Sequence, residues 1–451
     1  MTDASKRVAL LVIHTNSYFA NLLPVAKLLA ASGIWEPRFL FPSWYPTVAR
    51  DQERCDAEGF AWDADADEPR RAKSSLVRGM LARLRGTLPY VLGQHVATMR
   101  KLSALLRRHR VALLVLPADN RYDLAAYVKT AHGARIAAVA IPAFMAAANE
   151  WAEFVLEDPA HQLDGFANFI AGTLHPKWVR THAGKQLIAL PAAEVLAREW
   201  LGIAPARPWI LHSGNVDAIA VESEAMRRYC LFEGIPARQL VLTGSMDHDR
   251  MYARLGDAVA LREAMYRKLG MPPNRPLLLT ALAPDWLYGR GRKDCEFTEY
   301  RELVRFWIET LSATGCNVVV SLHPSVKRET MEYLEQWGAK ITDENVSSVI
   351  PLCDVYIACV SATIQWAIAC GKPVINYDVY RFRYPDYLGV EGCLNLETRA
   401  DYVAAVNRLT QDASYRAELT AKQARDAKYW GVLDGKAGER LLELFTSLSR
   451  A

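Results

Sequence analysis

Residues 354–376 read DVYIACVSATIQWAIACGKPVIN, and this stretch decides the fold class. The run 355–358 is wholly apolar and rich in strand-forming side chains, which predicts a fully buried strand. Small hydroxyl residues then precede an apolar segment of helical length at 362–369, and a second apolar run follows at 373–376. Strand, helix and strand in this order predict a parallel βαβ unit, because parallel strands need a crossover connection.

The same alternation extends outward from this unit in both directions. Further strands are predicted at 8–13, 37–41, 111–116, 135–141, 209–212, 218–221, 240–243, 276–281, 317–321 and 340–341. Helical patterns separate most of them, and one of these helices is predicted at 327–337. We therefore expect an α/β protein with two doubly wound parallel-sheet, Rossmann-like domains that face a cleft.

A polar, proline-bearing segment at 271–275 has the composition of a domain boundary. A chain of 451 residues also suits two cores better than one. We expect an N-terminal Rossmann-like domain over 1–270, a C-terminal Rossmann-like domain over 276–430 and a C-terminal helix over 431–451.

Composition excludes several classes of function. A net charge of +4 over this length is too small to predict a nucleic-acid partner. The eight cysteines form no Cys-x-x-Cys pair, and no apolar stretch reaches the roughly 18 to 20 residues of a membrane span. No Asp-x-Asp pair ends a predicted strand. The sequence predicts a cytoplasmic protein that requires no metal and no cofactor.

Loops of the second domain combine residues that suit a phosphate. A His-Pro pair follows the strand 317–321, and a Ser-Ala-Thr turn follows the strand 355–358. An imidazole, hydroxyl groups and the start of a helix all favour an anion, although either loop could instead serve only as a cap. The carboxyl ends of parallel strands lie at one edge of a sheet, so the two loops are expected together. The predicted donor-binding residues are His323, Pro324, Ser361, Ala362, Thr363, Gln365, Arg290 and Lys327.

The segment 315–378 resembles the nucleotide-binding half of bacterial surface-polysaccharide glycosyltransferases. It also looks like the sialyl and Kdo transferases and the glycerophosphotransferases that use cytidine nucleotides. The resemblance is carried by VVVSLHP at 318–324, IPLCDV at 350–355, SAT at 361–363, ACGKPVI at 369–375, and, in the first domain, AIAVESE at 218–224, GIP at 234–236 and LVLTGS at 240–245. It implies the GT-B architecture, a CMP- or UDP-linked sugar donor, and a glycan or lipid-linked acceptor in capsule or lipopolysaccharide synthesis.

Two other functions stay open. The UDP-N-acetylglucosamine 2-epimerases share the architecture, but their pattern has a His-Arg-Arg-Glu-Asn-like run where this chain has APDWLYGR at 283–290. That family also places acidic residues after Ser-Gly-Gly-x-Gln, where this chain has Trp366 and Ala367. A nucleotide-binding scaffold without catalysis is the second alternative.

The first domain is expected to bind the acceptor and to supply a base for its hydroxyl group. Polar residues that follow predicted strands are the candidates, although Asp119 or Asn120 could instead cap the helix expected near Tyr122. The predicted catalytic residues are Asp119, Glu150 and His14, and the predicted acceptor-pocket residues are Asn16 and Asn120.

Arginine and lysine residues recur among apolar residues over 70–110. A basic amphipathic surface of this kind can lie against anionic lipid headgroups, which would place the protein at the inner face of the cytoplasmic membrane. An ordinary solvated helix face has the same pattern.

Overall fold

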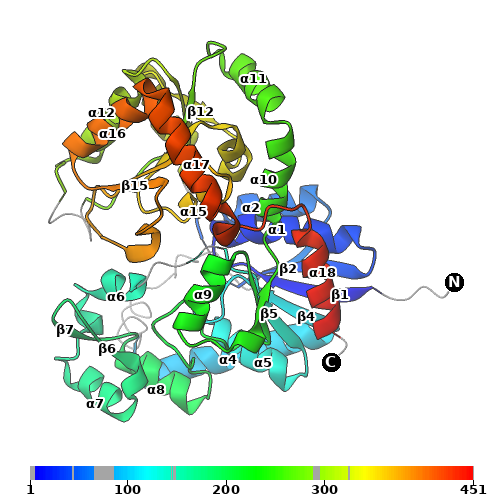
Figure 1. The fold of residues 1–451 in the computed structure, drawn as a ribbon. Helices are drawn as coiled ribbons and strands as arrows, with labels where there is room; N and C mark the ends of the chain where they lie inside the picture. The colour runs from blue at the N-terminus through cyan, green and yellow to red at the C-terminus, as the bar shows by residue number, and fades with distance from the viewer. Residues whose placement is uncertain are drawn as a thin grey trace. The chain divides into compact units, whose positions relative to one another are not determined.

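The computed structural model describes residues 6–42, 45–64, 86–143, 145, 149–287, 295–323 and 326–449. The chain divides into two compact units (Figure 1). Unit 1 comprises Met1–Val221, Tyr229–Val241 and Leu441–Ala451, and unit 2 comprises Glu222–Arg228 and Leu242–Arg440. The domain ranges expected from the sequence stay a prediction, since neither unit is one continuous stretch of chain.

Unit 1 is built on a seven-stranded sheet with the order β3-β2-β1-β4-β5-β8-β9. Its strands are β1 (Arg7–Val12), β2 (Trp35–Phe41), β3 (Ala61–Ala64), β4 (Val111–Leu116), β5 (Ala137–Ala140), β8 (Ala218–Val221) and β9 (Leu240–Leu242). The pairings from β3 through β8 are parallel. The chain winds outward in one direction through β1, β2 and β3 and in the other from β4, so the switch point lies between β1 and β4.

Helices cover both faces of this sheet. They are α1 (Asn16–Ala31), α2 (Val48–Ala57), α4 (Leu88–Arg108) and α5 (Leu124–Gly133). Right-handed crossovers place α1 and α2 on one face and α4 and α5 on the other (Figure 1). Helix α1 begins earlier than its apolar pattern indicates, because the Thr15 side chain accepts the backbone N–H of Tyr18 and caps it.

An insertion between β5 and β8 carries its own small core. It contains α6 (Glu150–Val155), α7 (Phe166–Leu174), α8 (Ala192–Trp200) and the antiparallel hairpin of β6 (Val179–His182) and β7 (Lys185–Ile188). Trp178 and Leu187 are buried at its centre. The strand predicted at 209–212 is wrong. The Asn120 amide donates to the backbone carbonyls of Arg207, Pro208 and Ile210, so a side chain and not a neighbouring strand binds the backbone here.

Unit 2 contains a six-stranded, wholly parallel sheet with the order β12-β11-β10-β13-β14-β15. Its strands are β10 (Leu277–Ala281), β11 (Asn317–Ser321), β12 (Lys340–Thr342), β13 (Val355–Ala358), β14 (Val374–Tyr377) and β15 (Cys393–Leu396). The order reverses between β10 and β13, which marks the second switch point. Both sheets confirm the predicted α/β class with doubly wound sheets.

The helices of unit 2 are α10 (Met246–Gly256), α11 (Ala258–Leu269), α12 (Tyr300–Ser312), α13 (Tyr333–Gln336), α14 (Val346–Val349), α15 (Ile364–Ala369), α16 (Arg399–Gln411) and α17 (Ala413–Trp430). Two more, α9 (Glu224–Phe232) and α18 (Ala437–Leu448), have residues in both units. The single helix predicted at 327–337 is wrong, because that stretch forms a 3₁₀ turn, Arg328–Met331, followed by the one-turn α13.

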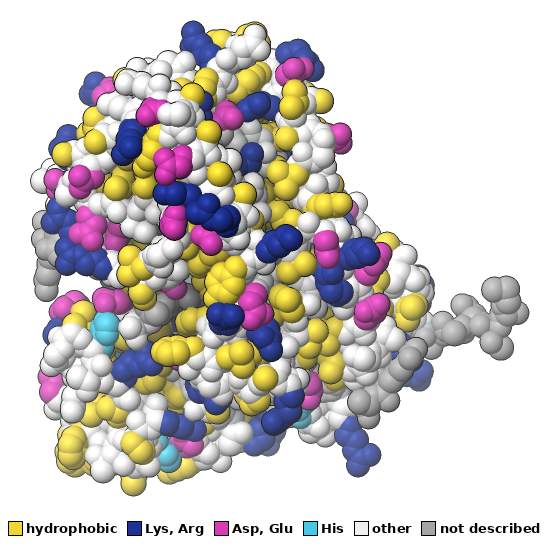
Figure 2. Space-filling model, viewed as in Figure 1, with side chains coloured by type: hydrophobic (Ala, Val, Ile, Leu, Met, Phe, Trp, Pro, Cys, Tyr) yellow, Lys and Arg dark blue, Asp and Glu magenta, His cyan; other side chains and the backbone are white. Residues whose placement is uncertain are grey.

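The surface carries charges of both signs. Figure 2 shows lysine and arginine interspersed with aspartate and glutamate over the face in view. Part of the predicted membrane-binding region 70–110 falls outside the described residues, and Arg100, Lys101, Arg107 and Arg108 are exposed on α4. Among the described helices, none has the length and the apolar character that crossing a bilayer requires.

Candidate functional site

The loop at residues 361–363 follows β13, next to the switch point of the sheet in unit 2. Its hydroxyl groups bind one another: Ser361 Oγ lies 2.7 Å from Thr363 Oγ1, which lies 2.5 Å from the Tyr356 hydroxyl. Thr363 therefore does not cap α15 with its side chain, contrary to the expectation of a side-chain cap. The hydroxyl groups of the loop are held in place before any ligand arrives.

The backbone of this loop and of Val360 before it is fixed by two side chains, those of Asn376 and Tyr387. Val360 has a φ of +42°, a left-handed conformation that a β-branched residue rarely adopts. Its N–H donates to Asn376 Oδ1 at 2.8 Å, and the Asn376 amide donates to Asn395. The Tyr387 hydroxyl donates to the carbonyl of Ser361 at 3.0 Å. Strained backbone held in this way recurs at ligand sites, which favours the loop as a binding element.

His323 lies just after β11. Much of its side chain is accessible, yet surrounding protein atoms desolvate the ring and lower the pKa of the imidazole. A neutral imidazole can still donate one hydrogen bond to a phosphate oxygen. Lys327 is exposed a few residues further on. Pro324 and Arg290 lie outside the described residues.

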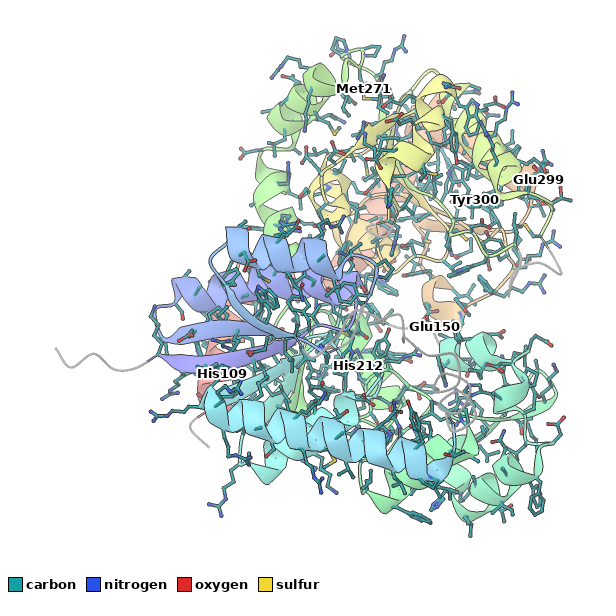
Figure 3. All side chains as sticks on the ribbon, turned by 180° about the vertical axis from the view of Figure 1, so that it is seen from behind. His109, Glu150, His212, Met271, Glu299 and Tyr300 are labelled. Carbon is teal, nitrogen blue, oxygen red and sulfur yellow. The ribbon has the colours of Figure 1, made fainter. Side chains whose placement is uncertain are left out.

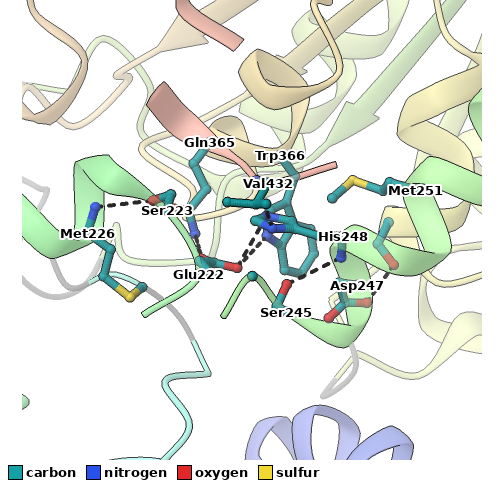
Figure 4. A network of polar contacts seen from close by, with 12 residues as sticks. Glu222, Ser223, Met226, Ser245, Asp247, His248, Met251, Gln365, Trp366 and Val432 are labelled. Atoms are coloured by element: carbon teal, nitrogen blue, oxygen red, sulfur yellow. Dashed lines mark hydrogen bonds and ion pairs between the residues drawn. The ribbon is translucent and has the colours of Figure 1, made fainter. Parts of the chain in front are cut away.

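Gln365 takes part in a buried polar network (Figure 4). Its amide donates to Glu222 Oε1 at 2.5 Å, and Trp366 Nε1 donates to Glu222 Oε2 at 3.3 Å. Burial raises the pKa of Glu222 to about 7, and hydrogen bonds from Trp366, Ser245 and Gln365 offset part of that rise. Because its amide nitrogen donates to Glu222, Gln365 binds within the protein, and this contact does not favour its predicted role in binding the donor.

His248 lies on the other side of the same carboxylate. Its Nε2 is 3.6 Å from Glu222 Oε2, and burial lowers the pKa of this histidine to about 3. It is therefore neutral at physiological pH. The sequence reasoning missed both residues. A glutamate directly after the wholly apolar stretch 218–221 was the signal that could have identified Glu222, since buried carboxylates are rare without partners.

In unit 1, His14 follows β1 at the switch point. Its ring stacks on Tyr122, with centroids 4.8 Å apart and planes inclined by 9°, and meets the Tyr127 ring edge-on. Burial lowers the pKa of His14 to about 3, which makes it a poor base at neutral pH. The Asn16 amide lies 3.2 Å from both carboxylate oxygens of Asp51, so this amide is engaged within the protein.

Asp119 and Asn120 follow β4 and anchor a neighbouring segment. The buried carboxylate of Asp119 accepts the backbone N–H of Ser213 at 2.5 Å and that of Asn215 at 2.6 Å. Burial raises the pKa of Asp119, and these backbone donors act against the rise. This geometry does not favour the prediction that Asp119 is the catalytic base, because both of its oxygens are already occupied.

Glu150 is the first residue of α6 and is labelled, with His212, in Figure 3. It is half-buried, and among the described residues it has no hydrogen-bond or ion-pair partner. Of the three predicted bases, it therefore has the carboxylate most available to an acceptor hydroxyl group. Glu150, His14 and Asp119 belong to unit 1, whereas the predicted donor residues belong to unit 2.

The described parts of the chain contain no cluster of side chains that is arranged to bind a metal ion. No group of three His, Cys, Asp or Glu side chains there has the arrangement of a metal site. The expectation that neither a metal nor a cofactor is required stays a prediction.

Solved structures share this fold over nearly the whole chain. A UDP-GlcNAc 2-epimerase from Neisseria meningitidis, bound to UDP-GlcNAc, has a TM-score of 0.55 and 12% identity, covering 98% of this chain and 100% of that one. The wall teichoic acid polymerase TagF, soaked with CDPG, has a TM-score of 0.56 and 9% identity, covering 99% and 89%. A glycosyltransferase from Rickettsia africae has a TM-score of 0.50 and 11% identity, covering 98% and 99%.

No protein-family model and no curated protein matches the sequence. At identities this low, structural likeness shows the fold alone. The fold is the GT-B architecture of two Rossmann-like sheets, shared with epimerases, a wall teichoic acid polymerase and a glycosyltransferase, as expected from the resemblance of residues 315–378.

Proposed function

We propose that the protein is a glycosyltransferase that moves a sugar from a CMP- or UDP-linked donor to a glycan or lipid-linked acceptor of the cell surface. The observation that carries the proposal is the hydroxyl-bearing loop 361–363, held in a strained conformation beside the switch point of unit 2. Ligands of doubly wound sheets bind at this position.

The donor phosphates are proposed to bind at the carboxyl edge of this sheet. Ser361 and Thr363 supply hydroxyl groups, and His323 supplies an N–H from the loop after β11. Lys327 adds a positive charge from the same loop region. The nucleotide-sugar and CDPG ligands of the GT-B structures support a nucleotide-linked donor here as well.

Unit 1 is proposed to bind the acceptor. Glu150 is our choice of general base, because its carboxylate is half-buried and has no partner among the described residues. A positioned base removes the proton of an acceptor hydroxyl as its oxygen bonds to the anomeric carbon, while the bond from that carbon to the donor phosphate breaks and the nucleotide leaves.

A nucleotide-sugar 2-epimerase is the alternative, since several GT-B neighbours carry that name. Trp366 stands where the epimerase pattern has an acidic residue, and its indole nitrogen binds the buried Glu222. An epimerase converts its nucleotide sugar without an acceptor, whereas a transferase requires one. Incubation with UDP-N-acetylglucosamine alone, followed by chromatography of the sugar, distinguishes the two.

The first experiment is a calorimetric and thermal-shift titration with CMP, CDP, UMP, UDP, GDP and ADP. A ligand that binds only the native state raises the melting temperature by mass action. Ser361→Ala and His323→Ala are expected to weaken binding of the preferred nucleotide by about tenfold each, the loss expected for one charge-assisted hydrogen bond. Ser348→Ala, in the same unit, is the matched control. Absence of binding by any nucleotide would overturn the proposal and favour a different role for unit 2.

A further inference from the structure

Unit 1 contains a pocket of about 80 Å³ beside the loop that follows β4. Its wall includes Arg121, Tyr122, Trp151, Arg198 and Trp209. The five residues come from the β4 loop, the insertion and the segment after it. This volume is far below the roughly 300–1,000 Å³ of pockets that enclose a drug-sized ligand. The pocket therefore suits one charged group and part of one sugar ring, and it is too small for a nucleotide sugar.

The pocket is cationic. The Arg121 guanidinium lies over the Trp151 ring, 4.4 Å from its centroid, and forms no ion pair with any described carboxylate. The side chain of Arg198 is buried; its Nε donates to Glu194 at 3.2 Å and its Nη2 to the carbonyl of Tyr122 at 2.9 Å. Its Nη1 has no acceptor among the described residues. No aspartate or glutamate lines the pocket.

Aromatic rings complete the wall. Tyr122 has a φ of +51°, is 51% exposed, and stacks on the buried His14. Arg198 holds the carbonyl of Tyr122 and so fixes this left-handed turn. A third guanidinium, that of Arg180, lies 5.5 Å from the centroid of the Trp209 ring. Guanidinium groups and aromatic faces in this arrangement bind an anionic group and the C–H face of an attached ring.

We propose that this pocket binds a sugar residue that carries a carboxylate or a phosphate group. The assignment of that residue to the acceptor rests on the proposed function, but the binding does not. Arg121 offers unshared N–H donors to the anion, Arg198 offers Nη1, and the exposed ring of Tyr122 packs against the sugar. The preference for charge follows from Arg121, whose guanidinium pairs with no described carboxylate, and from the remaining Nη1 of Arg198, whose charge is otherwise shared with Glu194.

The test uses the full chain and three probes: methyl glucuronide, the 6-phosphate of methyl glucoside, and uncharged methyl glucoside. Binding is measured by ligand-observed NMR and calorimetry on the native protein, Arg121→Gln, Arg121→Lys and the control Arg108→Gln. Arg108 is exposed on α4, so its substitution removes the same charge at a distance from the pocket. Circular dichroism and the melting temperature check that each variant folds.

We expect one acidic probe to bind more tightly than the uncharged one, and Arg121→Gln to weaken that binding about tenfold or more. Arg121→Lys should retain part of the affinity, and Arg108→Gln should leave it unchanged. A preference for the glucuronide identifies a carboxylate ligand, and a preference for the phosphate identifies a phosphorylated one. Equal binding of all three probes overturns the proposal. An equal loss of affinity in Arg121→Gln and in the control Arg108→Gln overturns it as well.

The outcome is independent of the nucleotide titration. If nucleotides bind but no acidic sugar does, the pocket proposal fails and the proposed function stands. If an acidic sugar binds through Arg121 and no nucleotide binds, the pocket is a sugar site and the transferase proposal fails.

Discussion

The burial of Glu222 predicts how the free energy of unfolding depends on pH. Burial raises its pKa from 4.5 to about 7 in the folded protein. Between these values the folded state retains a proton that the unfolded state has lost, so stability falls as pH rises through this range and levels off above pH 7. The two pKa values correspond to about 3 kcal/mol of unfolding free energy lost between pH 4 and pH 8.

The substitution Glu222→Gln removes this titration and leaves the size of the side chain unchanged. The free energy of unfolding of the variant, minus that of the native protein, should therefore increase by about 3 kcal/mol between pH 4 and pH 8. Subtracting the unfolding free energies of the two proteins at each pH cancels the contributions of the other titrating groups. His248, whose pKa is lowered to about 3, stays neutral throughout and does not take up the proton.

Urea unfolding followed by tryptophan fluorescence at several pH values measures this difference. Glu329→Gln is the control, because that residue is exposed in the same unit and the same charge is removed. A difference that stays constant from pH 4 to pH 8 would refute the reasoning, since Glu222 would then be ionised in both states. A decrease with pH would show that its partners stabilise the charged form.

Three further predictions follow from the sites. Asp119→Ala leaves the backbone N–H groups of the buried Ser213 and the part-buried Asn215 without acceptors, so it should lower the unfolding free energy by about 2–4 kcal/mol in urea titrations; little change would contradict the anchoring role. Glu150→Gln should slow sugar transfer by about 10²–10⁴-fold while nucleotide affinity stays unchanged, and an unchanged rate of transfer would exclude it as the base. Asn376→Ala removes the acceptor for the N–H of Val360 and should weaken nucleotide binding about tenfold by calorimetry, whereas Asn407→Ala, on α16, should not.

The fold class could be predicted from the sequence because parallel strands that are covered on both faces appear as short, almost wholly apolar runs. The runs that became β1, β4, β10, β11 and β13 are short, apolar and separated by helical patterns, and the structure places strands at each. The edge strands β9 and β12 were predicted, but the edge strands β3 and β15 and the β6–β7 hairpin were not accessible in this way. β15 carries a polar Asn395 in its short run, and the β6–β7 hairpin is amphipathic and lies in an insertion with its own core.

The candidate site was predictable to the level of loops but not of individual contacts. The Ser-Ala-Thr turn follows β13 and His323 follows β11, and these two strands lie on either side of β10 in one parallel sheet. Sequence alone could not show that Asp119 is enclosed by backbone donors or that Gln365 turns inward to Glu222. Both facts depend on partners that lie about a hundred residues or more away in the chain, and no local pattern records them.

The interleaved course of the chain has a consequence for synthesis of the protein. Unit 1 includes Leu441–Ala451, and the buried Leu441 and Phe445 and the hydrogen bond from Arg7 to Ser449 belong to its packing. Those residues follow all of unit 2 in the sequence, so the N-terminal sheet stays incompletely covered while unit 2 is translated. Loss of the last turns of α18 would therefore uncover the sheet of unit 1, which is the part of the protein that is translated first.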